Sequence, residues 1–386
     1  MSFKIKFLKA NEGDSLIIKF GSNRKIYNIL VDGGTGRVYN EVLRNELEIV
    51  RNAEQCLDLL IVTHIDDDHI GGILEMFYNL KGNAVDKEKR SLIKEVWFNS
   101  ELIIKERIKE LDIDAKAMFF KEGLLGKKKS VKQGVSFEEY LRRLDCWKKQ
   151  LIEYSNEFNE KPIGDGKITV LSPRWKGIEG LNRKWEREKG SIKKAGYRAD
   201  YKHSIESLIK RRFKEDKSVT NKSSISFILQ YENKKILMLG DAHPTDIIES
   251  LNEMGFNGEN PLNLEYVKIS HHGSKSNTSD ELLKILNCKK FIISSNGGSH
   301  CLPNKECLSR IINIFGQKLK SIKWKKFIAN SDKIRHIFIN RNYLANIING
   351  KNLNFYFNYP IWDSIFTEDE IKIYRINCVY KEELEV

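Results

Sequence analysis

The chain has 386 residues, of which 40% are hydrophobic and 10% are aromatic. This composition is typical of a globular protein and excludes a wholly disordered chain. Lysine and arginine outnumber aspartate and glutamate by 66 to 53, which gives a formal net charge of +13. Such a basic balance favours polyanionic partners, and nucleic acid is the first candidate.

No stretch of the sequence approaches the roughly 20 consecutive apolar residues that a membrane span needs. Residues 1–7 alternate apolar and polar side chains like a strand and do not resemble a signal peptide. The six cysteines are spread along the chain without a C-x-x-C pair. We therefore predict a cytoplasmic protein with reduced, mostly buried thiols and no membrane association.

The first part of the chain is rich in short strands. Turn-like segments separate runs of Ile, Phe, Leu and Val, which predict strands at residues 4–9, 15–20, 25–31 and 57–62. An amphipathic helix follows, because apolar residues recur at positions 70, 73, 74 and 77. The segment between this strand and this helix is therefore a connection of the kind on which α/β proteins place their chemistry.

The rest of the chain alternates insertions with a second α/β stretch. We predict a helical, charged insertion at about 80–165 and a basic insertion at about 172–220 within a domain that spans residues 1–317. Residues 318–386 are predicted to form a β-rich C-terminal extension of unknown role. The expected strands are 168–171, 225–231, 235–239, 265–270, 290–295, 334–340, 352–358 and 371–380, with helices from Ser279 and Asn304.

Six of the eight histidines fall in four short motifs, and each motif follows a predicted strand. In the first motif, His64, Asp66, Asp68 and His69 place four metal-binding side chains within six residues. A polar loop with a capping aspartate is the alternative interpretation. Packing these carboxylates and imidazoles together without a cation would be strongly repulsive, so the motif favours a divalent cation site.

The other three motifs repeat the same pattern of a strand followed by ligand-type side chains. Asp241 and His243 follow the second hairpin strand, and the next strand ends in His271-His272-Gly273. A single aspartate in such a place caps a helix as often as it binds a metal. His300 follows the strand 290–295, and its position after three similar motifs favours a functional role.

The order of these motifs, with Asp32-Gly33-Gly34 before them, resembles the metallo-β-lactamase fold. The pattern is most similar to the hydrolase domain of the bacterial competence protein ComEC and its stand-alone relatives, which carry H-x-D-x-D-H and H-H-G-S. The opening Gly13-Asp14-Ser15 also fits that branch. The resemblance implies an α/β (α+β) fold, a four-layer αββα sandwich with two metal ions at the edges of its sheets.

The resemblance also implies roles for the residues. His64 and Asp66 would hold one metal ion, while Asp68, His69 and one of His271/His272 would hold the second, with Asp241 between them. The alignment favours His272 as the ligand and leaves His271 near the substrate. Asp32 would support the first motif, and Asn221 and His243 would lie just outside the ligands. Asp68, His271 and His300 are the candidate catalytic residues, with His300 or the non-ligand histidine as proton donor.

One departure from the wider superfamily bears on the metal. A histidine normally lies about twenty residues before the bridging aspartate in that superfamily, and Asn221 stands at the equivalent place here. Oxygen donors at Asp66 and Asn221 would harden the site. We therefore predict two divalent ions, with Mn²⁺ preferred over Zn²⁺ or Mg²⁺.

The basic insertion carries most of the excess charge. Residues 172–222 contain sixteen lysines and arginines against seven acidic residues, with aromatic side chains interleaved. Unpaired bases stack on aromatic rings, so this segment predicts a nucleic-acid contact, whereas the alternative is a solvated lid. The candidate contact residues are Arg174, Trp175, Trp185, Lys210, Arg211 and Arg212.

These features predict a metal-dependent hydrolase, a two-metal phosphodiesterase or nuclease that acts on DNA or RNA. The first alternative is a hydrolase of a small phosphodiester or nucleotide messenger. The second is an effector subunit that is active only within a larger complex, because stand-alone relatives of the branch lie beside partner genes, including those of antiviral phage-defence systems.

Overall fold

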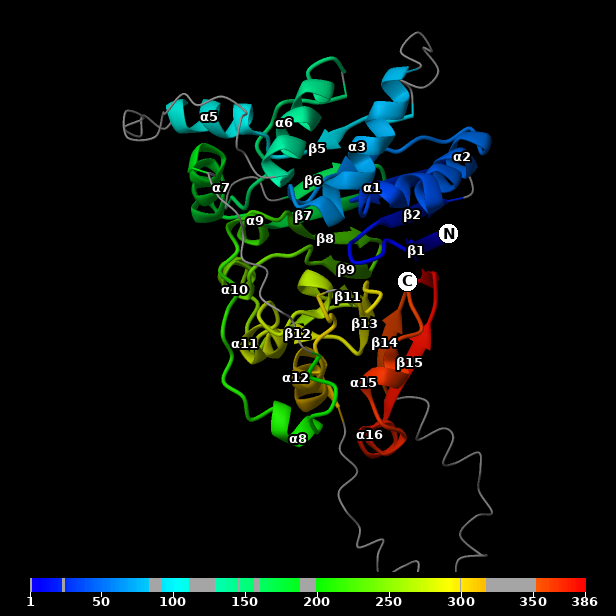
Figure 1. Ribbon diagram of the computed structural model, residues 1–386, viewed down its shortest axis with the longest axis vertical. Coiled ribbons are helices and arrows are strands. Elements are labelled where there is room, and N and C mark those ends of the chain that lie inside the picture. Colours follow the sequence, from blue (N-terminus) through cyan, green and yellow to red (C-terminus); the bar gives the residue numbers. More distant parts are fainter. Residues whose placement is uncertain are drawn as a thin grey trace, which may run out of the picture.

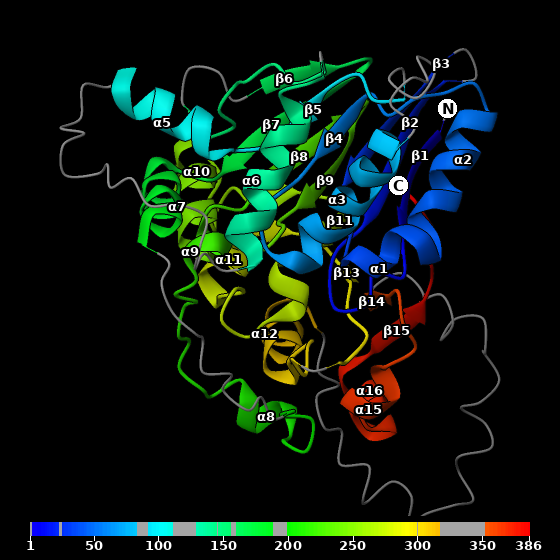
Figure 2. The same ribbon diagram turned by 45° about the horizontal axis from the view of Figure 1, so that its top comes forward.

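The computed structural model describes residues 2–22, 25–82, 92–110, 129–144, 146–155, 160–187, 199–298, 300–316 and 352–386, without the side chains of 80–82 and 185–187. Two large β-sheets lie face to face, and helices cover the outer face of each sheet (Figure 1). The same four layers are visible when the molecule is turned (Figure 2). The predicted αββα architecture is confirmed.

Within the described residues, the first sheet has six strands in the order β16-β1-β2-β3-β4-β5. β1, β2 and β3 pair antiparallel, whereas β3, β4 and β5 run parallel. The strands span Ser2–Phe7 (β1), Leu16–Ser22 (β2), Lys25–Val31 (β3), Leu59–Ile61 (β4), Val96–Trp97 (β5) and Glu383–Glu385 (β16).

The second sheet has eight strands in the order β15-β14-β13-β11-β9-β8-β7-β6, and β9 to β15 in this sheet run parallel. A separate pair of short strands joins β10 to β12. The strands span Glu160–Ile163 (β6), Gly166–Ser172 (β7), Ser226–Tyr231 (β8), Lys234–Met238 (β9), Leu262–Asn263 (β10), Tyr266–Lys268 (β11), Leu286–Asn287 (β12), Lys290–Ile293 (β13), Leu353–Phe357 (β14) and Ile376–Tyr380 (β15).

The side chains of each strand alternate between the space between the sheets and an outer layer. On β2, Leu16 and Ile18 pack into the core between the sheets, while Ile17 packs outward against the helices. On β9, Met238 points into the same central core and Leu237 points to the other outer layer. Because successive residues of a strand face opposite sides, strands that are apolar at every position are covered on both faces.

Helices α2, α3, α5, α6 and α7 contribute to the core on the first sheet, and α10, α11 and α12 contribute to the core on the second. The helical segments span Gly36–Val38 (α1), Tyr39–Leu43 (η1), Arg44–Asn52 (α2), Asp67–Gly82 (α3), Glu101–Glu110 (α5), Lys129–Leu141 (α6), Trp175–Arg187 (α7), Ile205–Leu208 (α8), Val219–Lys222 (α9), Pro244–Glu253 (α10), Ser270–Gly273 (η3), Asp280–Lys284 (α11), Lys305–Phe315 (α12), Trp362–Ile365 (α15) and Glu368–Tyr374 (α16).

The C-terminal strands pair with strands of both sheets. β14 and β15 continue the second sheet next to β13, and β16 pairs with β1 at the edge of the first sheet. The strand predicted at 371–380 is correct only from Ile376, because a capping box at Thr367 and Glu370 begins helix α16. The strand predicted at 334–340 lies outside the described residues.

The two predicted insertions also take part in the fold. The first supplies β5, α5, α6 and β6, and the second supplies α7, α8 and α9. Of the helices described, none combines the length and the apolar character that crossing a bilayer requires.

Candidate metal centre

The predicted ligands converge at one edge of the sandwich. His64 and His69 follow β4, Asp241 follows β9, and His271 and His272 form η3 after β11. β4 belongs to the first sheet, whereas β9 and β11 are parallel neighbours in the second. Because the carboxyl ends of parallel strands meet at the same edge, these side chains lie together between the sheets.

The backbone is strained where the cluster forms. Asp32, His271 and His272 have φ angles of 57°, 49° and 54°, in the left-handed region that L-residues rarely adopt. A left-handed residue with a side chain costs roughly 1–2 kcal/mol. Strain of this kind is found at functional sites, where the surrounding structure holds it in place.

Hydrogen bonds define the protonation of His64. The Thr63 hydroxyl donates to Asp32 Oδ2 at 2.7 Å, so its oxygen accepts from His64 Nδ1 at 3.0 Å. Nε2 of His64 is then left with a lone pair. This buried atom has no hydrogen-bond partner among the described residues, and it lies 3.8 Å from Asp241 Oδ2.

His69 and His272 are fixed in the same way. Nδ1 of His69 donates to Asp32 Oδ2 at 2.8 Å, and Nδ1 of His272 donates to the Ser294 carbonyl oxygen at 3.1 Å. In the neutral imidazoles both Nε2 atoms therefore present lone pairs, and they lie only 3.2 Å apart. Two lone pairs at this distance repel each other unless a proton or a metal ion lies between them.

Carboxylates surround these nitrogens. Asp241 Oδ1 lies 3.4 Å from His69 Nε2, and Asp68 Oδ2 lies 3.4 Å from His272 Nε2. Burial lowers the pKa of His272, but Asp241 and Asp14 outweigh burial and raise it to about 9. The cluster thus attracts positive charge, which a divalent cation supplies with displacement of protons.

The donor set fits a divalent metal ion in its chemistry, since imidazole nitrogens and carboxylate oxygens are mixed in a buried site. His69, His272, Asp68 and Asp241 surround one position. His64 and Asp66 lie on the other side of Asp241, with His64 Nε2 3.7 Å from Asp66 Oδ2. The side chains of Asp66 and Asp68 are each 32% exposed, so they mark the open face of the cluster.

Asp14 is a member of the cluster that the sequence did not single out as a site residue. Its donor oxygen lies within 4.8 Å of those of His69, Asp241 and His272, so these four side chains could hold a metal ion. Asp14 also forms an ion pair with the fully buried Lys268. The close approach is possible because Gly13 has no side chain, since a Cβ atom there would lie 1.7 Å from the Asp68 carbonyl oxygen.

Replacing Lys268 with methionine is expected to destabilise the protein by about 3–5 kcal/mol, because Asp14 would remain as a buried, uncompensated charge. Burial alone would raise the pKa of Asp14, but Lys268 and His272 hold it below its usual range, so the carboxyl is ionised near neutral pH. Urea unfolding of metal-free protein measures the loss. The double variant Lys268→Met with Asp14→Asn should recover most of it, and equal stability of the single variant and the parent would contradict this interpretation.

Asn221 and His243 both lie close to Asp216, which the sequence analysis did not identify as a site residue. Asn221 Nδ2 donates to Asp216 Oδ2 at 2.6 Å, and His243 Nε2 lies 3.7 Å from the same oxygen. Burial raises the pKa of Asp216, but His243 and the Ser218 backbone outweigh this and hold it below its usual range. Asn221 and His243 therefore both lie beside Asp216, next to the candidate ligands.

His300 lies apart from the buried cluster. Its side chain is 54% exposed, and its Nε2 atom lies 3.7 Å from Glu12 Oε2. Glu12 precedes Gly13, which contacts the backbone of the first motif. His300 is therefore near the rim of the site.

The structure divides the predicted nucleic-acid contacts into two groups. Arg174 is paired with Glu249 and Glu253 and stacks on Tyr154 at 4.8 Å. Arg211 is paired with Glu306 at 3.2 Å. Both cations thus have carboxylate partners 75 to 95 positions away, which sequence reading cannot place, although Arg211 shares Glu306 with Arg310.

The other predicted nucleic-acid contacts differ in how far they are exposed to solvent. Trp175 is half-buried against the outer core of the first sheet. Lys210 and Arg212 are exposed, and neither has an ion-pair partner within the described ranges. The side chain of Trp185 lies outside the described part of the chain.

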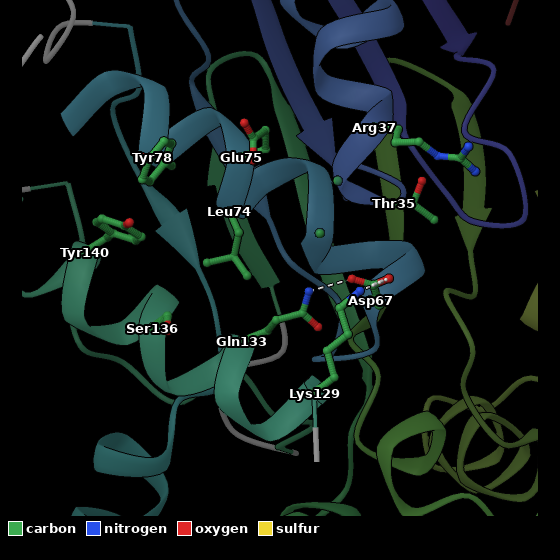
Figure 3. A pocket seen from close by; sticks show the side chains of 12 residues that line it. Thr35, Arg37, Asp67, Leu74, Glu75, Tyr78, Lys129, Gln133, Ser136 and Tyr140 are labelled. Atoms are coloured by element: carbon green, nitrogen blue, oxygen red, sulfur yellow. Dashed lines mark hydrogen bonds and ion pairs between the residues drawn. The ribbon is translucent and has the colours of Figure 1, made fainter. Parts of the chain in front are cut away.

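The middle aspartate of the first motif has a different role. Asp67 lines a pocket of about 600 Å³ between α1, α3 and α6, shown in Figure 3. Its carboxylate accepts hydrogen bonds from Lys129 at 2.8 Å and Gln133 at 2.5 Å. Asp67 thus contacts α6 of the first insertion.

No protein-family model matches the sequence, and no curated protein matches it. Among solved structures, the chain is similar to the metallo-β-lactamase fold protein YhfI from Bacillus subtilis, with 12% identity and a TM-score of 0.38 over 82% of this chain and 94% of that one. A mutant of the CmlA β-hydroxylase gives 11% identity and a TM-score of 0.34 over 80% and 49% of the two chains. A protein of unknown function from Enterococcus faecalis gives 10% identity and a TM-score of 0.28 over 70% and 50%. Because these likenesses are distant, the description of the fold rests on its own sheets and layers, and that of the site on its own geometry.

Proposed function

We propose that the protein is a divalent-metal-dependent hydrolase that cleaves phosphodiester bonds in nucleic acid. The observation that carries the proposal is the arrangement of His64, His69 and His272, whose Nε2 lone pairs converge on Asp241 in a buried site. Only a cation satisfies such a set without protonating it.

A divalent ion held by His64, His69, His272 and Asp241 would polarise a phosphoryl oxygen and lower the pKa of water, which would supply a nucleophile near neutral pH. The chain orients the imidazoles of His64 and His69 through Asp32, which accepts hydrogen bonds from both Thr63 and His69. Asp66 and Asp68 lie on the open face, where a diester enters. His300 at the rim is our candidate for donating a proton to the leaving oxygen.

The charge distribution supports nucleic acid as the substrate. Lys210, Arg212, Lys214 and Lys217 are exposed and lie in the segment 210–217, which also contains Asp216 beside the metal cluster. Cations of this kind contact phosphates and release counterions on binding. The net charge of +13 has the same sign as this segment.

A small phosphodiester is the second candidate, because Arg174 and Arg211, two of the predicted phosphate contacts, are engaged in ion pairs within the protein. Cleavage of single-stranded DNA, single-stranded RNA, a cyclic dinucleotide and bis-p-nitrophenyl phosphate with Mn²⁺ separates the candidates. A nuclease should turn over the long strands with the highest kcat/KM. Turnover of the small diesters alone would overturn the choice of nucleic acid.

We further propose that Mn²⁺ supports more activity than Zn²⁺, because carboxylates provide a large share of the donors. Replacing Asp66 with histidine should raise the ratio of Zn²⁺ to Mn²⁺ activity roughly tenfold, or ~1.4 kcal/mol of differential affinity. Asp67→His is the matched control, since Asp67 lies in the neighbouring pocket and should leave the ratio unchanged. Best activity of the parent with Zn²⁺ would contradict the preference.

A further inference from the structure

His271 is held by a chain of amide hydrogen bonds. Asn277 Nδ2 donates to Asp216 Oδ2 at 3.2 Å and to the Asp241 backbone oxygen at 3.1 Å. Two acceptors on one side fix the orientation of the Asn277 amide, so its Oδ1 atom is the one that faces His271 Nδ1 at 2.9 Å. A side-chain oxygen accepts, and therefore Nδ1 of His271 carries the proton.

Asn221 does not change this assignment. Its amide nitrogen lies 3.3 Å from His271 Nδ1, but its short hydrogen bond of 2.6 Å goes to Asp216. Turning the Asn277 amide to let Nδ1 accept would place an oxygen against two acceptors. The Nε2 atom of His271 is therefore the lone-pair atom, as it is in His64, His69 and His272.

This lone pair points at a carboxylate. His271 Nε2 lies 3.8 Å from Asp241 Oδ2, and His64 Nε2 lies 3.8 Å from the same oxygen. His272 Nε2 is equally far from this oxygen but lies closer to Asp68 Oδ2 and His69 Nε2, at 3.4 and 3.2 Å. Acceptors that face one another across this distance repel unless a cation lies among them. The backbone of His271 is held in the left-handed region to bring the imidazole to this place.

We propose that His271 is itself a metal ligand, on the side of Asp241 that also contains His64 and Asp66. This inference rests on the proposed metal-dependent function. Each metal position then has two imidazoles and one carboxylate of its own, with Asp241 between them: His64, His271 and Asp66 on one side, and His69, His272 and Asp68 on the other. The sequence favoured His272 as the only ligand of its motif.

The same geometry explains why the site can have an asparagine at position 221. By resemblance, a histidine is expected at this place, and here the asparagine amide binds Asp216 instead. The missing imidazole is supplied by His271 from the end of β11. Asp216 acts as a positioning residue, because it orients both amides that contact His271, and it lies at the end of the basic insertion.

Metal content of the full chain tests the inference without reference to activity. After equilibration with Mn²⁺ and dialysis, His271→Asn is expected to reduce the bound metal from about two ions to about one per chain, with loss of the spin-coupled two-ion signal in electron paramagnetic resonance. Asparagine suits the left-handed backbone but is too short to reach the site. His271→Gly, which relieves the backbone entirely, should give the same loss.

His203→Ala is the control, because it removes an exposed imidazole outside the cluster and should retain both ions. Circular dichroism confirms that each variant is folded. If both His271 variants bind two ions with the affinity of the parent, the inference is overturned and the proposed function is left standing. A parent chain that binds no Mn²⁺ would overturn the metal centre and the proposed function together.

Discussion

Asp241→Asn is expected to lower metal-dependent hydrolysis by about 10³-fold or more, which corresponds to roughly 4 kcal/mol of lost transition-state stabilisation. Both oxygens of Asp241 face ligand nitrogens, Oδ1 towards His69 and Oδ2 towards His64, His271 and His272. An amide has the same shape but one oxygen and no charge, so it cannot serve two metal positions. Initial rates at saturating Mn²⁺ measure the effect.

Thermal unfolding separates this loss from damage to the fold. A ligand that binds only the folded state stabilises it by RT ln(1 + [L]/Kd), so Mn²⁺ should raise the Tm of the parent. Asp241→Asn should be folded without metal and show little of this rise, whereas Asp67→Asn should keep both the rise and the activity. Full activity of Asp241→Asn would remove the cluster from the mechanism.

Reversing the charge of Lys210 and Arg212 to glutamate is expected to weaken nucleic-acid binding steeply. Each phosphate contact to a single strand contributes about −0.7 to the slope of log affinity against log salt concentration, so losing two contacts should make that slope shallower by roughly 1.4. Both side chains are exposed, and Arg211 between them is left unchanged because it pairs with Glu306. Binding of a labelled oligonucleotide across salt concentrations measures the slope.

Lys284→Glu with Lys289→Glu provides the same change in net charge at another place. Lys289 precedes β13, whereas the site lies after the opposite end of that strand, beyond Ile293. The control pair should therefore change binding far less. Hydrolysis of bis-p-nitrophenyl phosphate should be nearly the same in all three proteins, because it needs only the metal cluster. Unchanged cleavage of DNA and RNA by Lys210→Glu with Arg212→Glu would favour a small diester as substrate.

The parts of the site that the sequence predicts are those set by local patterns. His64–His69 follows an apolar run and precedes a helical period, so its place at a strand end can be read directly. Asp241 and His271-His272 repeat this pattern, and parallel strands bring such ends together. The layers of the fold can be predicted in the same way. β4 is apolar at every position, which indicates a strand that is buried on both faces of its sheet.

The parts that the sequence did not reveal depend on contacts between distant residues. Asp14 pairs with Lys268, 254 positions away, and Asp216 meets His271 from another element. The partners of Arg174 on α10 are likewise invisible to local charge counting. The sequence did not reveal that the C-terminal strands pair with β13 and β1. An alternating pattern of side chains indicates that a segment is extended, but it does not indicate which strand lies beside it.

Titration of metal-free protein with Mn²⁺, followed by cleavage of a labelled single-stranded oligonucleotide, tests the central claim most directly. Activity should be absent without a divalent ion, rise with added Mn²⁺ until the cluster is filled, and disappear again with a chelator. Asp241→Asn should stay at the baseline throughout the titration. Cleavage by the metal-free protein at the rate of the metal-loaded protein, or cleavage by Asp241→Asn at the parental rate, would contradict a metal-dependent hydrolase centred on this aspartate.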